Sequence, residues 1–291
     1  MENTITSDNM ANVIITTINT ILENLFSSID NTLYSVLDDI TFINSDILKT
    51  PYFQRILGMS TTNGILVIAN SLLLGFLIYF SIKYLLAHFY SLEVEAPHQF
   101  VFKLLFFGLA MNYSYFILEQ ILNISSNITL AIRNLGETIF NTEICFSSLI
   151  NEINSCIGID SIATNIFSVD GLIKSTLSFS LLSLVFSYSF RYIMIKVFAL
   201  LSPFAILSLS LNSTSWFFKA WFKNLFSLLF IQIIVSIVLL IIFSMDYSSD
   251  GIVVKFLYIG AIYALIRVNS FVREFVGGIS TVVSHPVNKV R

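Results

Sequence analysis

The sequence predicts an all-α integral membrane protein: a polytopic helical bundle of five transmembrane helices, with six as the alternative, and an N-terminal amphipathic helix outside the membrane. Of its 291 residues, 56% are hydrophobic and only 11% are charged, and the mean hydropathy is +0.83. Soluble domains contain about 25% charged residues, so this chain cannot cover a soluble globule with polar surface. A net charge of −3 and two cysteines also exclude a basic nucleic-acid-binding domain and a cysteine-rich scaffold.

Residues 1–63 are predicted to form an extracytoplasmic segment built on the amphipathic helix. Glu2 and Asp8 stand where a cleavable signal peptide would be basic, so no signal peptide is expected. Its apolar residues recur at intervals of three and four and define an assembly stripe of Ile14, Ile18, Ile21, Leu25, Ile29, Leu33, Val36 and Ile40. The opposite face is acidic, which disfavours adsorption to an anionic membrane. It favours packing against another protein or another copy, with folding back onto the chain's own outer loop as an equal alternative.

Five stretches are long and apolar enough to be predicted as transmembrane helices. They are 64–80 with a continuation to 89, 104–121, 171–190, 224–244 and 252–266. The first two fall in a region at 64–122, and the other three in a transmembrane core at 171–270. A sixth apolar stretch, 197–213, is short and contains Pro203, which removes a helix donor and predicts a helix break.

Charge decides how the stretch at 197–213 is interpreted. If it is a broken or re-entrant hairpin, ten basic residues lie on the inner side and four on the outer side, as the positive-inside rule requires. The sequence therefore predicts five spans, an outside N-terminus and a basic cytoplasmic tail at 271–291. Six spans remain the alternative.

The segment 123–170 is predicted to be an extracytoplasmic loop, because it is polar and rich in Asn and Ser. It contains Cys145 and Cys156 on the side of the membrane where oxidation is possible, so a disulfide between them is predicted, with two free thiols as the alternative.

No arrangement of residues typical of an enzyme is found in the sequence. His88 and His98 flank two glutamates in the inner loop, but Pro97 interrupts any helix that would align them, so a solvated turn is expected rather than a zinc site. Glu119 lies near the end of a predicted span, where snorkelling or capping is expected. Motifs of nucleotide hydrolysis, zinc proteases and serine hydrolases are absent. No catalytic, metal or cofactor site is predicted.

The most distinctive segment runs from 190 to 241. Arg191, Lys196, Lys219 and Lys223 carry four positive charges without an acid and are predicted to line a cytoplasmic mouth attractive to acidic partners or polyanions. Trp216 and Trp221 are predicted to be interfacial anchors of the following span.

This segment resembles the TrbL-type polytopic inner-membrane subunit, a VirB-family component of type IV secretion and conjugal transfer systems. Members of that family typically have a proline in an apolar stretch, followed by a tryptophan-containing start of an uncharged span. Pro203, Trp216 and Trp221 stand at the corresponding positions of this chain. The resemblance covers about residues 60–275 and is strongest over 190–245. It implies a bacterial cytoplasmic (inner) membrane protein with an outside N-terminus and a cytoplasmic C-terminus, the layout that the charge count also favours.

The resemblance implies a non-enzymatic channel or platform subunit that assists conjugation, DNA transfer or protein secretion. Its partners would be membrane lipid, further copies in a homo-oligomer, separate ATPases, single-span envelope proteins, and a transient DNA or protein substrate. The main alternative is a membrane subunit of an unrelated small-solute transporter or permease. A pore-forming protein of phage or mobile-element origin is a second alternative.

Overall fold

The computed structural model describes residues 13, 16, 17, 20, 36–58, 63–90, 96–157, 169–245 and 252–276. These residues contain helices and no β-strand, which confirms the all-α class. A helical turn at 36–41 comes first. It is followed by η1 (Ser45–Leu48), α2 (Pro51–Leu57), α3 (Ile65–Tyr90), α4 (Pro97–Asn112), α5 (Ser114–Phe140), α6 (Phe146–Ile157), α7 (Val169–Leu207), η2 (Ser208–Ser210), α8 (Ser215–Phe243) and α9 (Ile252–Val276).

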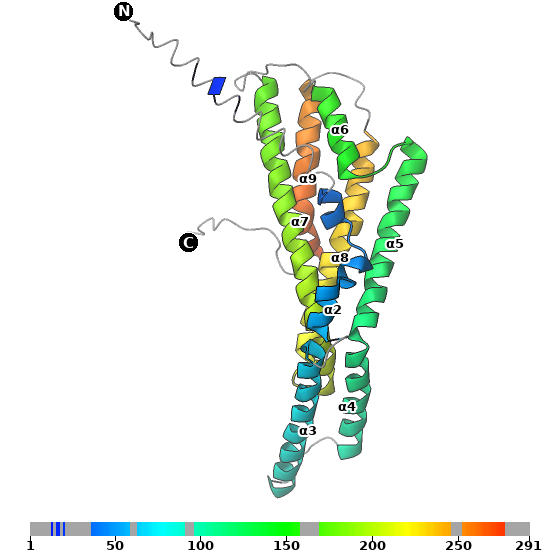
Figure 1. The fold of residues 1–291 in the computed structure, drawn as a ribbon, viewed down its shortest axis with the longest axis vertical. Coiled ribbons are helices and arrows are strands. Elements are labelled where there is room, and N and C mark those ends of the chain that lie inside the picture. Colours follow the sequence, from blue (N-terminus) through cyan, green and yellow to red (C-terminus); the bar gives the residue numbers. More distant parts are fainter. Residues whose placement is uncertain are drawn as a thin grey trace, which may run out of the picture.

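Helix α8 is the central helix of the body of the molecule, because it packs against α5, α7 and α9 (Figure 1). Its sequence is apolar on almost all sides, which suits a helix with neighbours on several faces. The hydroxyl of Tyr188 in α7 donates a hydrogen bond of 3.1 Å to the carbonyl oxygen of Leu265 in α9. Tyr188 is fully buried, so this bond fixes how the two helices align inside the core.

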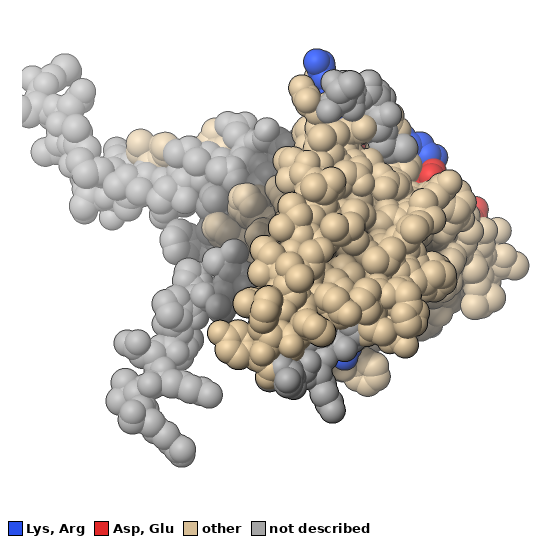
Figure 2. Space-filling model, turned by 90° about the horizontal axis from the view of Figure 1, so that it is seen from below, with Lys and Arg blue, Asp and Glu red and all other residues tan. Residues whose placement is uncertain are grey.

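Helices α3 and α4 form a hairpin that extends beyond the end of this body (Figure 1). Only 11% of the most apolar stretch of α3 is buried, compared with 56% in α7 and in α8. The hairpin is held together by apolar contacts, among them the stacked rings of Phe80 and Phe100. Seen from this end, the described surface is almost entirely uncharged (Figure 2). Such a surface suits a hydrocarbon environment.

Four helical segments of the described chain are long and apolar enough to cross a membrane, namely Ile65–Tyr90, Ser175–Ser210, Ser215–Phe243 and Val253–Val276. They coincide with four of the predicted spans, 64–89, 171–190, 224–244 and 252–266. The total reaches five only if α4 and α5 together count as one broken span. The chain is thus a multi-pass helical membrane protein with four or five long apolar helices.

The second predicted span, 104–121, is not one straight helix. It includes the end of α4, a bend of 59° and the start of α5. At the end of α4 the side-chain amide of Asn112 donates to the carbonyl oxygen of Gly108, and the backbone N–H of Tyr113 still bonds to Leu109. A side-chain partner at this point lets the backbone turn while its polar groups stay paired.

The predicted helix break at Pro203 is wrong, and so is the separate hairpin at 197–213. Helix α7 continues through Pro203 to Leu207. Proline cannot donate to the carbonyl oxygen four residues earlier, which belongs to Ala199. The hydroxyl of Ser202 donates to that oxygen over 2.8 Å and compensates for the missing backbone bond.

Residues 36–58, which we call the N-terminal insert, pack against the helices and against the start of α6 in the predicted outer loop, which bears out for these residues the alternative that the segment folds back onto the chain. Leu37, Ile43, Leu48 and Phe53 are buried in the same core cluster as residues of α7 and α8. The insert lies between α5 and α7 at the middle of the body (Figure 1). The acidic residue Glu119 of α5 contacts it through a 3.8 Å ion pair with Lys49.

The predicted outer loop at 123–170 is largely helical in its described part. Helix α5 continues to Phe140, and Asn141 ends it in a left-handed conformation. Helix α6 follows after five residues. The buried side of α5 is formed by Leu118, Leu122, Ser125 and Thr129, which recur at helical spacing. The polar composition concealed this amphipathic helix.

Candidate functional site

The described core contains one fully buried guanidinium group, that of Arg191 in α7. Its Nε donates to the carbonyl oxygen of Leu228 over 2.7 Å, and one terminal nitrogen donates to the carbonyl oxygen of Thr41 over 2.8 Å. The other terminal nitrogen donates to Oε1 of Gln232 over 3.0 Å. All three acceptors are neutral oxygens. The cation is therefore stabilised by hydrogen bonds rather than by a salt bridge.

Gln232 extends this network in two directions. Its Oε1 also accepts the backbone N–H of Ile43 over 3.2 Å, and its Nε2 donates to the hydroxyl oxygen of Ser125 over 2.8 Å. The hydroxyl of Ser125 in turn donates to the carbonyl oxygen of Leu229 over 3.4 Å. Gln232 is fully buried. We call Arg191, Gln232, Ser125 and the backbone of Thr41 and Ile43 the arginine cluster.

The arginine cluster joins four parts of the chain. Arg191 comes from α7, Gln232 from α8, Ser125 from α5 and Thr41 from the N-terminal insert. Arginine presents several donors in a fixed planar geometry, which suits it to hold acceptors from different elements at once. Its chemical role in this geometry is to hold the insert against the helices.

Arg191 does not line a cytoplasmic mouth, contrary to the prediction. Its side chain is 0% exposed and lies near the middle of α7 and α8. The partners that bury it come from distant parts of the sequence, so its neighbours along the chain did not reveal its position. Its positive charge therefore does not belong to the surface that carries Lys219 and Lys223.

The other basic residues of the predicted mouth lie outside the core. Lys219 and Lys223 are exposed on the first turns of α8, and Lys196 is half-buried with its ammonium over the ring of Tyr192 at 4.7 Å. The formation of a mouth by these three residues stays a prediction.

The two tryptophans differ. Trp216 is 66% exposed, and its role as an interfacial anchor stays a prediction, whereas Trp221 is only 4% exposed. The indole nitrogen of Trp221 donates to the carbonyl oxygen of Phe198 over 2.8 Å. Trp221 is therefore a core residue between α7 and α8 rather than a group that reaches the membrane surface.

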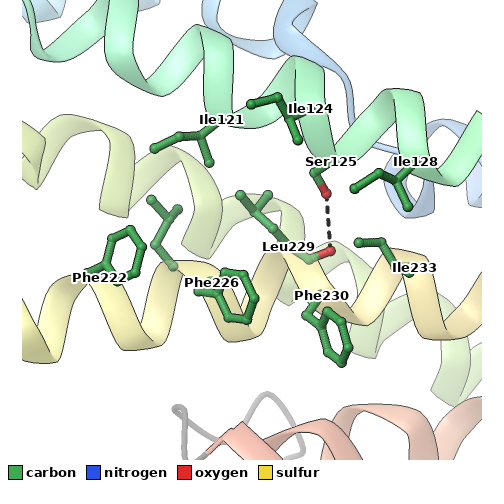
Figure 3. Close-up of a pocket in the computed structure, with 10 residues that line it drawn as sticks. Ile121, Ile124, Ser125, Ile128, Phe222, Phe226, Leu229, Phe230 and Ile233 are labelled. Carbon is green, nitrogen blue, oxygen red and sulfur yellow. Dashed lines mark hydrogen bonds between the residues drawn. The ribbon is translucent and has the colours of Figure 1, made fainter.

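An apolar groove follows α8 on the side that faces α5. Phe222, Phe226 and Phe230 stack at four-residue intervals along one wall, and Ile121, Ile124 and Ile128 of α5 form the other (Figure 3). Its volume is about 230 Å³. A second hollow of about 200 Å³ adjoins it toward the turn before α8 and shares Ile121 and Phe222 with it. We call the first hollow the phenylalanine groove.

Cys145 is a free and buried thiol, so the predicted disulfide with Cys156 is not formed in this structure. Cys145 immediately precedes α6, and Cys156 lies near the other end of that helix. Eleven helical residues span about 16 Å at 1.5 Å per residue, whereas a disulfide joins Cα atoms less than about 7 Å apart. Burial raises the pKa of the Cys145 thiol, so at neutral pH it is protonated and unreactive.

We expect reducing agent to leave the thermal unfolding temperature of the full-length protein unchanged, because no disulfide stabilises the loop. The measurement is a thermal scan in detergent with and without reductant. The variant Cys156→Ser serves as a control, since removal of either partner of a real disulfide would mimic reduction. A drop of several degrees on reduction would contradict the helical separation of the two cysteines.

Most of the predicted assembly stripe lies outside the described residues. Val36 is exposed and Ile40 packs partly against the core, whereas nothing is described for the remaining positions, Ile14, Ile18, Ile21, Leu25, Ile29 and Leu33. The inner-loop glutamates are also outside the described part. Among the described residues, no group of three or more His, Cys, Asp and Glu side chains could hold a metal ion.

Sequence reasoning missed Gln232 and Ser125. Gln232 could have been found from the sequence, since it is a large amide within an otherwise apolar span. Polar side chains in membrane helices usually have a specific partner, so this residue indicates a buried polar contact. Asn70 and Asn112, whose side-chain amides hydrogen-bond to each other across α3 and α4, were missed for the same reason.

The fold and the apolar helices define a multi-pass helical membrane protein with a buried polar cluster at its centre. Comparisons with protein-family models, with curated proteins and with solved structures find no match to this chain.

Proposed function

We propose that this chain is a non-enzymatic membrane subunit of a multiprotein translocation assembly, of the kind that the resemblance to TrbL-type subunits implies. In this role it forms part of the platform of a type IV secretion or conjugation machine in a bacterial cytoplasmic membrane. Separate ATPases supply the energy, and DNA or protein is the substrate. The N-terminus is outside and the C-terminus is in the cytoplasm.

The observation that carries this proposal is the projecting α3–α4 hairpin. A helix that belongs to a self-contained bundle buries one face against its own chain, but α3 buries very little. The exposed surface of the hairpin is apolar and continuous, with Leu74, Ile78 and Leu85 among its exposed residues. Surfaces of this kind are available to helices of other subunits in the membrane.

The amide pair of Asn70 and Asn112 supports association at this surface. The two side chains donate to each other over 3.2 Å in both directions, and both residues are exposed. The amide of Asn70 keeps a second N–H and a second acceptor site beyond this pair, and in lipid these can be satisfied by a polar group of a neighbouring helix. The pair therefore marks the position on the hairpin where a neighbouring subunit would pack.

The proposal is tested by isolating the tagged full-length protein from its native membrane in mild detergent and identifying everything bound in stoichiometric amounts. Recovery of several copies with an ATPase and single-span envelope subunits is the expected result. Recovery of a lone monomer, or of one solute-binding protein, would overturn it and favour a small-solute transporter.

We expect the double variant Asn70→Leu/Asn112→Leu to shift the purified protein toward the monomer, because it removes the polar contact of the hairpin surface. The effect should be about tenfold on the self-association constant, since such contacts contribute about 1–2 kcal/mol. Sedimentation in detergent measures it. The variant Gln120→Leu changes an exposed amide of α5 and should leave association unchanged; an equal shift in both would remove the hairpin from the interface.

A further inference from the structure

The turn between α7 and α8 brings exposed lysines to one end of the phenylalanine groove. Lys219, Lys223, Phe226 and Phe230 follow one another at spacings of four, three and four, which places them on one face of α8. The face therefore begins with two lysines. It continues as the aromatic rings that line the groove, which Figure 3 shows. No acidic side chain of the described chain forms a salt bridge with either lysine.

The groove has the dimensions of one lipid chain. From Phe222 to Ile233 it follows α8 over eleven residue steps, or about 16 Å at 1.5 Å per residue. One leaflet of the hydrocarbon core is about 15 Å deep, half of a core about 30 Å thick. The walls are apolar, with the hydroxyl of Ser125 as a polar group already engaged by Gln232.

We propose that the phenylalanine groove is a binding site for one anionic phospholipid. The acyl chain lies along Phe222, Phe226 and Phe230, and the phosphate contacts Lys219 and Lys223. Exposed Trp216, next to the lysines, lies at the headgroup level. This site is independent of the proposed secretion function.

The test is native mass spectrometry of the full-length protein in neutral detergent, titrated with phosphatidylglycerol or with phosphatidylcholine of identical acyl chains. We expect one phosphatidylglycerol to bind about tenfold more tightly than phosphatidylcholine, since two lysines contact the anionic headgroup. Lys219→Gln/Lys223→Gln should abolish this preference. The control Lys83→Gln/Arg273→Gln removes the same charge elsewhere and should keep it.

A second pair of variants tests the groove itself. Ile124→Trp fills the groove from an exposed position of α5 and should weaken binding of both lipids, whereas Leu130→Trp, exposed on the same helix outside the groove, should not. Glycerol phosphate without acyl chains should not compete. Equal affinity for the two lipids, competition by glycerol phosphate, or identical behaviour of test and control variants would each overturn the proposal.

Discussion

Replacing Arg191 with Met is expected to lower the free energy of unfolding by about 2–3 kcal/mol and to release the N-terminal insert from the body. The variant removes hydrogen bonds to Thr41, Leu228 and Gln232, all of them inside the core. Part of the loss is offset, because the variant no longer has to desolvate a cation. The measurements are thermal unfolding in detergent and protease access to residues 36–58.

Three comparisons separate the arginine cluster from a general effect of charge. Arg267→Met removes an exposed guanidinium and should change stability little. Arg191→Lys keeps the charge but cannot reach three acceptors with one ammonium group, so it should resemble Arg191→Met. A combined Arg191→Met/Gln232→Met variant should lose less than the sum of the single variants, because the two side chains share one hydrogen bond. Unchanged protection of residues 36–58 in Arg191→Met would show that the cluster does not hold the insert.

The long apolar helices were predictable because their signal is local. Helices α3, α8 and α9 each consist of a run of apolar residues that needs no partner elsewhere in the sequence to be recognised. The bend at Tyr113 and the continuity of α7 were not predictable in this way. Local side-chain bonds accompany both features, from Asn112 to Gly108 at the bend and from Ser202 to Ala199 where Pro203 lacks its N–H.

The candidate site was harder to predict because its contacts are distant in sequence. Arg191 and Thr41 are 150 residues apart, and Gln232 and Ser125 are 107 apart. Periodicity identifies the face of a helix but not its partner, so Arg191 was grouped with Lys196, Lys219 and Lys223 by proximity along the chain. Lys219 and Lys223 of α8 are exposed, whereas Arg191 is buried, so the three do not share one surface.

The N-terminal insert was predictable only in part, because packing against another protein and folding back onto the outer loop were left as equal alternatives. The contact with the outer loop is made by Asp38. In the structure its carboxylate accepts hydrogen bonds from the backbone N–H groups of Phe146 and Ser147 and from the hydroxyl of Ser147, at 2.8, 3.2 and 2.7 Å. These are the first residues of α6. Asp38 therefore caps a helix that lies more than a hundred residues further along the chain.

Replacing Asp38 with Ala is expected to cost about 2 kcal/mol of stability and to loosen α6. The first N–H groups of a helix have no partner within it, and a carboxylate also interacts favourably with the positive end of the helix dipole. Loss of Asp38 leaves these groups unpaired in a half-buried position. Hydrogen exchange should therefore become faster in the first turn of α6, and thermal unfolding should shift to lower temperature.

The neighbouring residue gives a matched control for this prediction. Asp39 is exposed and carries the same charge one position along, so Asp39→Ala should leave both measurements nearly unchanged. Asp38→Asn keeps an acceptor oxygen but loses the charge, and its amide cannot accept all three bonds, so an intermediate loss is expected. If Asp38→Ala and Asp39→Ala behave alike, the carboxylate of Asp38 does not cap α6, and the N-terminal insert is held by Arg191 and its apolar contacts alone.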